Sequence, residues 1–481
     1  MDWAEGDVQT KPRRTPLPKT QLSLILMIQS SEPIACTVIY PFIAQLIRST
    51  GVTRGDEARV GYYAGMIESI FFLSEGLVCF AWGWASDKIG RRPILLWAPL
   101  GLAVATVGFG LSKTFWLLVF WRAVQGVFNG NIGVTRTAIA EITDSTNIAD
   151  AYMLYPIVWE VGVTIGPAIG GLLSEPASNW PHIFSGVKLL VDYPYLLPCL
   201  VSGSYALFVF AMCCIGLKET HPSFRKPKID QSEDPSRTPL LSNPDGESVY
   251  DATAQRPTTS MQPADPASTT ISSSIFNSNL NIVLVNHSFL AFTDMANAVL
   301  IPILYSTSNS MGGLGFSTKT IGTILAVYNF VNAFVQITLM KRFLKRLGPR
   351  RLYQIAYPML SVPFAMMMCE QMLVSWYGKV TLGVWAAIVF QLTGALGITV
   401  AYACSHLLHV ETATSGTLGA VNGFSQTIAS VIRTIAPTLA SSLFALSLQS
   451  GILGGYLVYV VMITVTLIGS ICASKLPKHL S

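Results

Sequence analysis

Five carboxylates lie inside long apolar stretches of this 481-residue chain, where acidic side chains are costly and usually functional. They are Glu32, Glu68, Glu75, Glu160 and Asp294. Two arginines, Arg122 and Arg433, lie in similar surroundings. An apolar environment favours the protonated carboxyl group, whereas a nearby arginine favours the carboxylate. A carboxyl group that alternates between these environments can take up a proton in one and release it in the other.

Glu32 is the first candidate for this proton chemistry. It lies about 11 residues into its apolar stretch, which is roughly 16 Å at 1.5 Å per helical residue and therefore near the middle of a membrane. We expect Arg122 to be its electrostatic neighbour, and we add Glu160 and Asp294 as further proton-coupling candidates. Each of these groups has an alternative, fixed role, as a locked ion pair or as a permanently protonated acid.

Three other polar side chains in apolar stretches are candidates for lining a substrate cavity. They are Trp159, Asn422 and Arg433, and Arg433 would contact either an anionic substrate or Asp294. Glu68 and Glu75 are seven residues apart, nearly two helical turns, so they share one helix face. For this pair, cavity lining and a structural role are both open.

His406 and His409 are one helical turn apart beside Glu411 and have the spacing of a metal-binding pair. We interpret them instead as a solvated pair at the membrane interface. The eight cysteines lie in apolar runs without metal-ligand spacing. The sequence also shows no nucleophile–base pair and no nucleotide-binding loop. We therefore expect no metal, no cofactor and no enzymatic activity.

The composition indicates which class of protein carries these charged side chains. Hydrophobic residues make up 51% of the chain and charged residues only 12%, against about 25% charged residues in soluble proteins. A polytopic helical membrane protein tolerates this composition because its outer surface faces lipid. Stretches of roughly 20 apolar residues, the length of one membrane crossing, occur at 21–48, 60–86, 93–112, 114–140, 151–174, 197–217, 278–305, 318–341, 351–373, 378–405, 414–446 and 451–474.

These twelve predicted spans fall into two halves. We expect two pseudo-symmetric six-helix bundles around a central cavity, at 21–217 and 278–474, with tails at 1–20 and 475–481. The stretch between them, 218–277, is rich in Pro, Ser, Thr and Asp and poor in aromatic residues. It cannot bury a core, so we expect a disordered loop.

The basic residues orient the chain. Of the 31 Lys and Arg residues, 22 fall in the tails and in loops on the same side, seven fall in loops on the opposite side, and two lie inside spans. Cytoplasmic loops carry an excess of Lys and Arg, so both termini should be cytoplasmic. Because the basic residues lie in short loops, they do not point to nucleic acid.

A charged loop from Gly83 to Arg92 joins the second and third predicted spans. Its spacing, Gly-x-x-x-Asp-Lys-x-Gly-Arg-Arg, resembles the signature loop of the major facilitator superfamily. We expect Gly83 to let two helices approach closely and Gly90 to supply the turn. Asp87 should pair with Arg91 or with a neighbouring helix. Together with Arg92, these residues would form a cytoplasmic latch that stabilises one of two transporter states.

Two further motifs carry the same resemblance. Span four contains Arg122-Ala-Val-Gln-Gly126, similar to the family's Arg-x-x-Gln-Gly motif, which implies proton coupling at Arg122. Glu141, at the end of this span, is placed to meet the charged loop. Span five contains a motif that resembles one characteristic of drug/proton antiporters. Its small residues permit close helix contact and its proline permits a kink, so we expect a hinge formed by Gly162, Gly166, Pro167, Gly170 and Gly171.

The chain is most similar to fungal twelve-span members of the drug/proton antiporter type and to zinc-induced-facilitator-like carriers. The resemblance implies a secondary transporter, acting as a monomer, that exports a small organic molecule in exchange for protons by alternating access. The alternatives are a proton-coupled importer or facilitator of a nutrient or metal chelate, and a membrane receptor or scaffold that does not transport. We expect the plasma membrane rather than the vacuolar membrane, because the Leu240-Leu241 pair lacks the acidic residue of a sorting signal.

Overall fold

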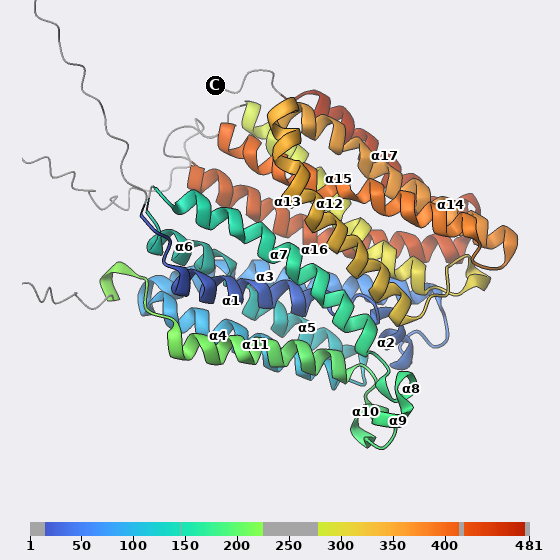
Figure 1. Cartoon of the computed structure of the whole chain (residues 1–481). Helices are drawn as coiled ribbons and strands as arrows, with labels where there is room; N and C mark the ends of the chain where they lie inside the picture. Colours follow the sequence, from blue (N-terminus) through green and yellow to red (C-terminus); the bar gives the residue numbers. More distant parts are fainter. Residues whose placement is uncertain (1–14, 145, 225–277, 413–417, 477–481) are drawn as a thin grey trace, which may run out of the picture.

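The computed structural model describes residues 15–144, 146–224, 278–412 and 418–476, and within these ranges it contains helices and no strand. The first half of the chain (Figure 1) forms α1 (Lys19–Thr37), α2 (Ile43–Ser49), α3 (Ala58–Ile89), α4 (Arg91–Gly110), α5 (Phe115–Asn129), α6 (Ile132–Ile142), α7 (Ile148–Leu173), α8 (Pro176–Asn179), α9 (Pro181–Phe184), α10 (Lys188–Asp192) and α11 (Leu196–Gly216). The second half forms α12 (Ser278–Ser306), α13 (Thr318–Ala356), α14 (Ser361–Tyr377), α15 (Leu382–Thr412), α16 (Leu418–Ser450) and α17 (Leu457–Ser474). The central loop expected at 218–277 lies outside the described residues from position 225 onward.

Nine helical segments of the described chain are long and apolar enough to cross a membrane. One of them, 318–377, contains two crossings. It bends at Gly348, whose φ of 71° is left-handed, and at Pro349, so that α13 ends one crossing there and α14 completes the next. The remaining crossings are the broken pairs α1 with α2 and α5 with α6. The predicted all-helical fold of twelve crossings in two bundles is confirmed.

Two predicted spans are interrupted within continuous apolar stretches. The first, 21–48, is divided between α1 and α2 around Pro41, which cannot donate a backbone hydrogen bond. The fourth, 114–140, is divided at Gly130 and Asn131 between α5 and α6. Both interruptions lie inside apolar runs, so hydropathy alone does not reveal them.

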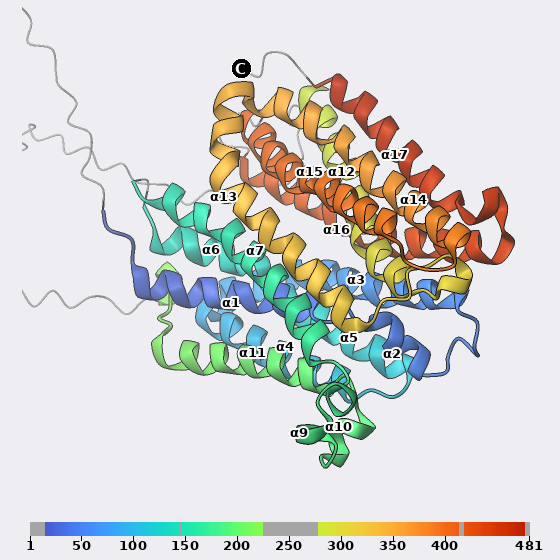
Figure 2. The same cartoon turned by 45° about the vertical axis from the view of Figure 1, so that its right-hand side comes forward.

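The two halves meet along two pairs of helices, α3 with α16 and α7 with α13. Small residues make these contacts possible, because a Cβ atom added to Gly65 would collide with Ser441, and one added to Gly171 would lie 2.6 Å from the Cα of Gly322. The Thr438 hydroxyl also hydrogen-bonds the Ser69 hydroxyl at 2.8 Å. In Figures 1 and 2, α7 and α13 cross at the end of the molecule away from the described chain ends. The two halves are therefore sealed at that end.

The contact between α3 and α16 loosens toward the other end. A Cβ atom on Gly61 would lie 3.3 Å from the Ser441 carbonyl oxygen, and one on Gly76 would lie 3.8 Å from Ser430. One on Gly83 would meet no described atom within 4 Å, so the expected close helix approach at Gly83 is wrong for this conformation. Gly83 lacks a neighbour because α3 and α16 are in close contact at Gly65 but not at the end of α3 where Gly83 lies.

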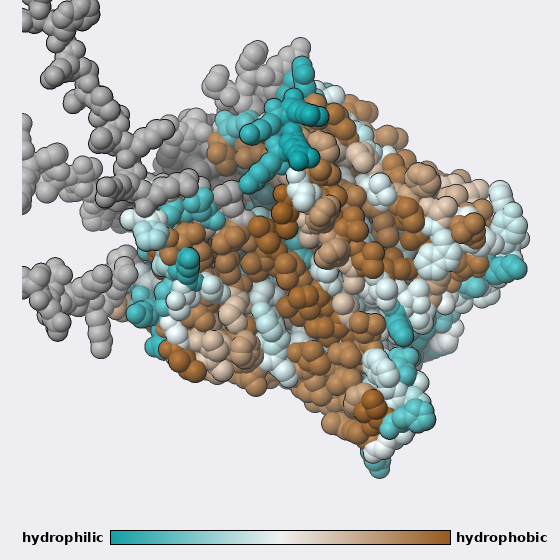
Figure 3. Space-filling model, viewed as in Figure 1, coloured by the Kyte–Doolittle hydropathy of each residue, from teal (hydrophilic) through white to brown (hydrophobic). Residues whose placement is uncertain are grey.

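The surface agrees with a membrane location. In Figure 3, apolar residues cover most of the middle of the visible face, and hydrophilic residues gather toward its margins. Large apolar side chains are exposed on several helices, among them Phe80 at 83% and Ile215 at 88%. Such exposure suits contact with lipid tails.

Candidate functional site

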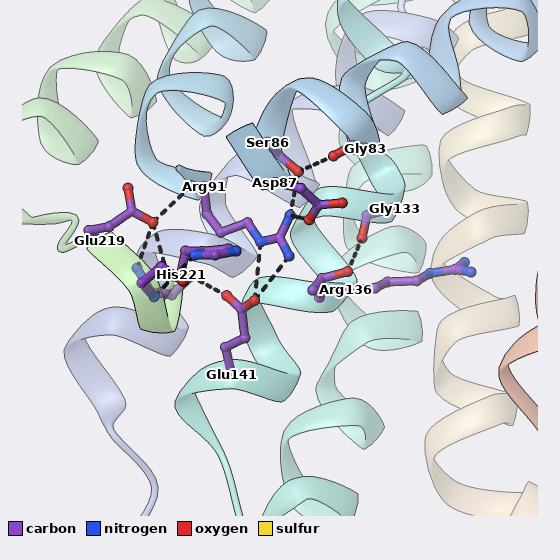
Figure 4. Close-up of polar contacts among 12 residues, drawn as sticks. Gly83, Ser86, Asp87, Arg91, Gly133, Arg136, Glu141, Glu219 and His221 are labelled. Carbon is purple, nitrogen blue, oxygen red and sulfur yellow. Dashed lines mark hydrogen bonds and ion pairs between the residues drawn. The ribbon is translucent and has the colours of Figure 1, made fainter. Parts of the chain in front are cut away.

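Arg91 is the centre of a charged network at the open end of the first half (Figure 4). Its guanidinium lies 2.5 Å from Asp87 Oδ1 and 3.1 Å from Glu141 Oε1, and it donates a 2.5 Å hydrogen bond to Ser86 Oγ. The second oxygen of Glu141 accepts a hydrogen bond from the Thr220 hydroxyl at 2.7 Å. The expected Asp87–Arg91 pair and the contact of Glu141 with the charged loop are confirmed. The network ties together α3, α4, α6 and the segment after α11, all in the first half.

Glu219, in the segment after α11, caps the first turn of α4. Its carboxylate accepts hydrogen bonds from the backbone N–H groups of Arg91 at 2.8 Å and Arg92 at 3.0 Å. Gly90 makes this possible, because its φ of 96° is left-handed and a Cβ atom there would lie 2.5 Å from Glu219 Oε2. The expected turn at Gly90 is confirmed. Partial burial raises the pKa of Glu219, but hydrogen bonds from four backbone N–H groups lower it by a larger amount. The net shift of the pKa is downward.

Replacing Glu219 by alanine should lower the free energy of unfolding by about 0.5–2 kcal/mol, the usual contribution of a helix cap. The measurement is a denaturant titration of the purified protein in detergent. Because the folded-state pKa is lowered, the contribution is full above the ordinary value of 4.5 and is lost as the pH falls through the lowered pKa. The difference between the two proteins should therefore shrink in acid.

A matched control is Glu411→Ala, at the exposed end of α15. We expect this change to alter the free energy of unfolding by less than about 0.5 kcal/mol. Equal effects of the two substitutions at pH 7 would contradict the capping role of Glu219.

Arg122 is fully buried and forms an ion pair with Glu68, with 2.7 Å between Nη2 and Oε2. The Tyr40 hydroxyl donates to the other Glu68 oxygen at 2.8 Å, and Arg122 Nη1 donates to Gln125 Oε1 at 2.9 Å. The expectation that Glu32 neighbours Arg122 is wrong, because Glu68 on α3 faces this part of α5. Helix spacing placed Glu68 and Glu75 on one face of α3, but it did not show which of the buried acids Arg122 meets.

Glu32 and Glu75 are held together by one amide. Asn129 Nδ2 lies 2.9 Å from Glu32 Oε1 and 3.1 Å from Glu75 Oε2. The Gln29 side chain donates to the second oxygen of Glu32 at 2.9 Å. Both carboxylates are buried, at 9% and 6% exposed. The bridging role of Asn129 was not anticipated, since asparagine in the fourth span carried no separate signal.

Cations from both halves act on this pair of acids. Arg136 of α6 and Arg433 of α16 are the charged neighbours of Glu32 and Glu75. A small pocket beside Glu32 is lined mainly by α1, α4 and α5 and carries polar side chains of Gln29, Ser31, Asn129, Asn131 and Thr135. Two acids of one half and an arginine of the other are therefore close enough to interact.

In the second half, a tyrosine separates Asp294 from Arg433. The Tyr402 hydroxyl donates to Asp294 Oδ2 at 3.1 Å and accepts a hydrogen bond from the Arg433 guanidinium. No direct ion pair joins Asp294 and Arg433 in the described chain. The expected partnership of these two residues is therefore indirect, and Tyr402 is a site residue that the sequence analysis missed.

Glu160 lies where α7 meets α13. Asn332 of α13 donates to Glu160 Oε2 at 3.3 Å and to the Thr399 hydroxyl at 2.6 Å. Three residues along α7, the Val163 carbonyl accepts a 2.8 Å hydrogen bond from Asn329. Glu160 thus belongs to the first half but is held by a side chain of the second, so a relative movement of the halves changes its surroundings.

The glycines of span five pack as their spacing predicts. A Cβ atom on Gly162 would collide with Pro33, and one on Gly166 would collide with Thr37, both on α1. A Cβ atom on Gly170 would collide with the Val38 carbonyl oxygen, and Gly171 faces α13. Pro167 lies inside α7, which continues from Ile148 to Leu173. The motif therefore fastens α7 to α1 on one side and to the second half on the other.

The remaining candidates contribute less. Trp159 is half-buried beside Glu160 on α7, and the Asn422 side chain lies outside the part of the chain that the structure describes. The sequence analysis also overlooked Glu370 of α14, which is fully buried and has no hydrogen-bond partner for either carboxylate oxygen among the described residues. An acid inside the ninth predicted span was the available signal.

Comparison with known proteins agrees with this geometry. The family model of the Major Facilitator Superfamily matches residues 25–437. The chain is 31% identical to "Major facilitator-type transporter psiT2" of Psilocybe cyanescens, covering 96% of this chain and 91% of that protein. It is 28% identical to "Major facilitator superfamily multidrug transporter mfsB" of Aspergillus fumigatus, covering 90% of this chain and 80% of that protein.

Solved structures show the same fold. A D-xylose-proton symporter superposes with a TM-score of 0.68 at 12% identity, covering 96% of this chain and 98% of that chain. At this identity the likeness supports the fold alone. Taken with the matched family model and the psiT2 relative, it shows that the chain belongs to the major facilitator superfamily.

Proposed function

We propose that this membrane transporter exports small organic molecules in exchange for protons. Membership of the family makes it a multi-pass membrane protein that moves small-molecule substrates and is not an enzyme. The observation that carries the proton coupling is the Glu32–Asn129–Glu75 bridge. Two carboxylates that accept hydrogen bonds from the same amide nitrogen cannot both ionise without strong repulsion, so the pair is suited to hold a proton and to release it when its surroundings change.

Export is favoured by the motif from Gly162 to Gly171, which resembles that of drug/proton antiporters and lies at the contact between the halves. The name of the Aspergillus fumigatus relative, a multidrug transporter, agrees with a small organic substrate. We infer from the distribution of Lys and Arg that the termini are cytoplasmic. The seal formed by Gly65 and Gly171 then lies on the outer side, and the open end faces the cytoplasm.

In this arrangement the network around Arg91 is the cytoplasmic latch in its disengaged state. Asp87 is 63% exposed, and the ion pairs of Arg91 with Asp87 and Glu141 lie within the first half. Closing the cytoplasmic end would bring the Gly83 face of α3 against α16, as Gly61 and Gly65 already do at the outer end. We propose a monomer in the plasma membrane as the working unit.

The test is flux of a cationic dye into inverted proteoliposomes that contain the full-length protein. An imposed pH gradient, acidic inside, should drive dye accumulation at least about tenfold above that in protein-free vesicles. The reason is that one proton moving down a tenfold difference in proton concentration supplies about 1.4 kcal/mol, which corresponds to a tenfold difference in dye concentration. Collapse of the gradient with a protonophore should abolish the accumulation. Equal flux with and without the gradient would favour a facilitator, and accumulation driven by the opposite gradient would favour an importer.

A further inference from the structure

Three histidines form a cluster in the second half that the proposed transport cycle has not used. His287 of α12 packs against His409 of α15, with 5.0 Å between ring centroids. His406, one turn earlier on α15, lies 6.0 Å from His287 and 6.4 Å from His409. The interpretation of His406 and His409 as a solvated interfacial pair is wrong for His409, which is fully buried, because α12 covers it and brings His287 into contact.

The cluster continues into the site already described. The Tyr402 ring lies 5.9 Å from His287 and 6.3 Å from His406, and its hydroxyl donates to Asp294. Positions 402, 406 and 409 follow one face of α15, and positions 287 and 294 follow one face of α12, since seven residues are nearly two turns. These side chains therefore form one polar seam between α12 and α15, about 10 Å long at 1.5 Å per residue.

The seam reaches the surface at His406 and is enclosed at His287 and His409. His406 is exposed, whereas His287 is 3% exposed and bonds the Ser405 hydroxyl through Nδ1 at 3.0 Å. Neither ring nitrogen of His409 has a hydrogen-bond partner among the described residues, although the side chain is fully buried. Buried polar nitrogens normally have a protein or water partner. The unpaired nitrogens of His409 therefore point to water inside the seam.

We propose that the seam of His406, His409, His287 and Tyr402 is a proton path that connects Asp294 with water at the open end of the transporter. This inference rests on the proposed proton antiport. A neutral imidazole accepts a proton at one ring nitrogen and releases another from its second nitrogen, so a proton that leaves the Asp294 carboxyl group passes through imidazolium to water. The reverse transfer loads Asp294 from the same side.

The charged groups around the seam favour the transfer of a proton along it over the storage of a proton on a histidine. Arg433 faces His287 and His406 from α16, and Arg136 faces His406 from α6. These two cations disfavour a lasting imidazolium, whereas Asp294, next along the seam, favours the arrival of a proton. Within the described residues no group of three or more His, Cys, Asp or Glu side chains has the geometry to hold a metal ion, so the cluster is not a preformed metal site.

The test uses the cationic-dye assay with His287→Gln, His406→Gln and His409→Gln in the full-length protein. Gradient-driven flux should fall about tenfold, less than the hundredfold typical of one positioned proton-transfer group because water fills part of the path. Exchange of labelled for unlabelled dye without a gradient needs no net proton transfer, and it should change by less than about twofold. The matched control is His182→Gln, an exposed histidine of α9 at the sealed end, which should leave both rates unchanged.

The outcomes separate this inference from the proposed function. A wild-type protein that couples dye to the gradient, with His variants that couple equally well, would overturn the proton path and leave antiport standing. Parallel loss of gradient-driven flux and exchange would assign the histidines a structural role and also overturn the path. A wild-type protein without coupling would remove the proposed function, and the path with it. Selective loss of gradient-driven flux is the result that supports the path.

Discussion

Replacing Arg122 by leucine should lower the free energy of unfolding by about 3–5 kcal/mol, the cost of breaking a buried ion pair on one side. Glu68, which is 4% exposed, would keep the hydrogen bond from the Tyr40 hydroxyl but lose its cation. The measurement is a denaturant titration in detergent micelles, followed by helical circular dichroism. An effect of this size is a large part of the stability of an ordinary domain, so the variant should also be poorly expressed.

The double variant Arg122→Leu with Glu68→Leu provides the control. It removes both charges from α3 and α5, and apolar replacement of a whole buried pair is often neutral or stabilising. We expect it to regain at least about half of the lost stability. A double variant as unstable as Arg122→Leu alone would show that the arginine acts through Gln125 or the Cys36 carbonyl instead.

The double variant also decides between the two roles left open for Arg122. If the pair only holds helices together, the refolded double variant should transport dye at a rate within about threefold of the wild type. If Arg122 belongs to proton coupling, the protein should be folded but should ignore the gradient. The structural role and the coupling role can be told apart because stability and flux are measured on the same preparation.

The pairing of Arg122 illustrates what the sequence could and could not predict. Apolar runs long enough to cross a membrane predicted the spans well, because that length is imposed by the bilayer. The burial of Glu68, Glu75 and Arg122 followed from their places in those runs. Which acid meets the arginine depends on the rotation of α3 relative to α5, and that rotation is set by packing across the whole bundle.

Local motifs were predicted well where backbone conformation decides the result. Gly90 required a left-handed turn, and the span-five glycines required close helix contact, and both features depend on residues near in sequence or on spacing along one helix. The prediction of a close helix contact at Gly83 was wrong, because the contact requires a neighbouring helix that spacing along α3 alone does not supply. The same small-residue face of α3 is packed at Gly65 and open at Gly83, so the sequence pattern does not show which part of the face is in contact.

Polar residues that complete a network were the hardest to predict. Asn129, Tyr402 and His287 are common residue types, and each gains importance only from what α1, α15 or α12 places beside it. A carboxylate in a span is conspicuous because it is costly there, whereas an amide or a phenol is tolerated. The sequence therefore identified the acids and missed the groups that connect them.

Replacing Glu32 by glutamine should reduce gradient-driven dye flux at least about a hundredfold, because the variant removes a group that must gain and lose a proton in every cycle. Glutamine keeps the volume of the side chain and an oxygen that accepts the hydrogen bond of Asn129. The variant should therefore remain folded and should still exchange labelled for unlabelled dye. A matched control is Glu57→Gln, in the loop before α3, where the carboxylate pairs with Arg48 and lies away from the site.

Asn129→Leu tests the bridge itself, because it keeps both carboxylates and removes the amide that joins them. If the shared amide sets the proton affinity of the pair, this variant should still couple dye to the gradient, but the pH of half-maximal flux should rise. The direction follows because the amide N–H groups stabilise the carboxylates, and without them the protonated form persists to higher pH. An unchanged pH profile in Asn129→Leu, together with full activity in Glu32→Gln, would remove the Glu32–Glu75 pair from the coupling mechanism and leave Glu160 and Asp294 as its carriers.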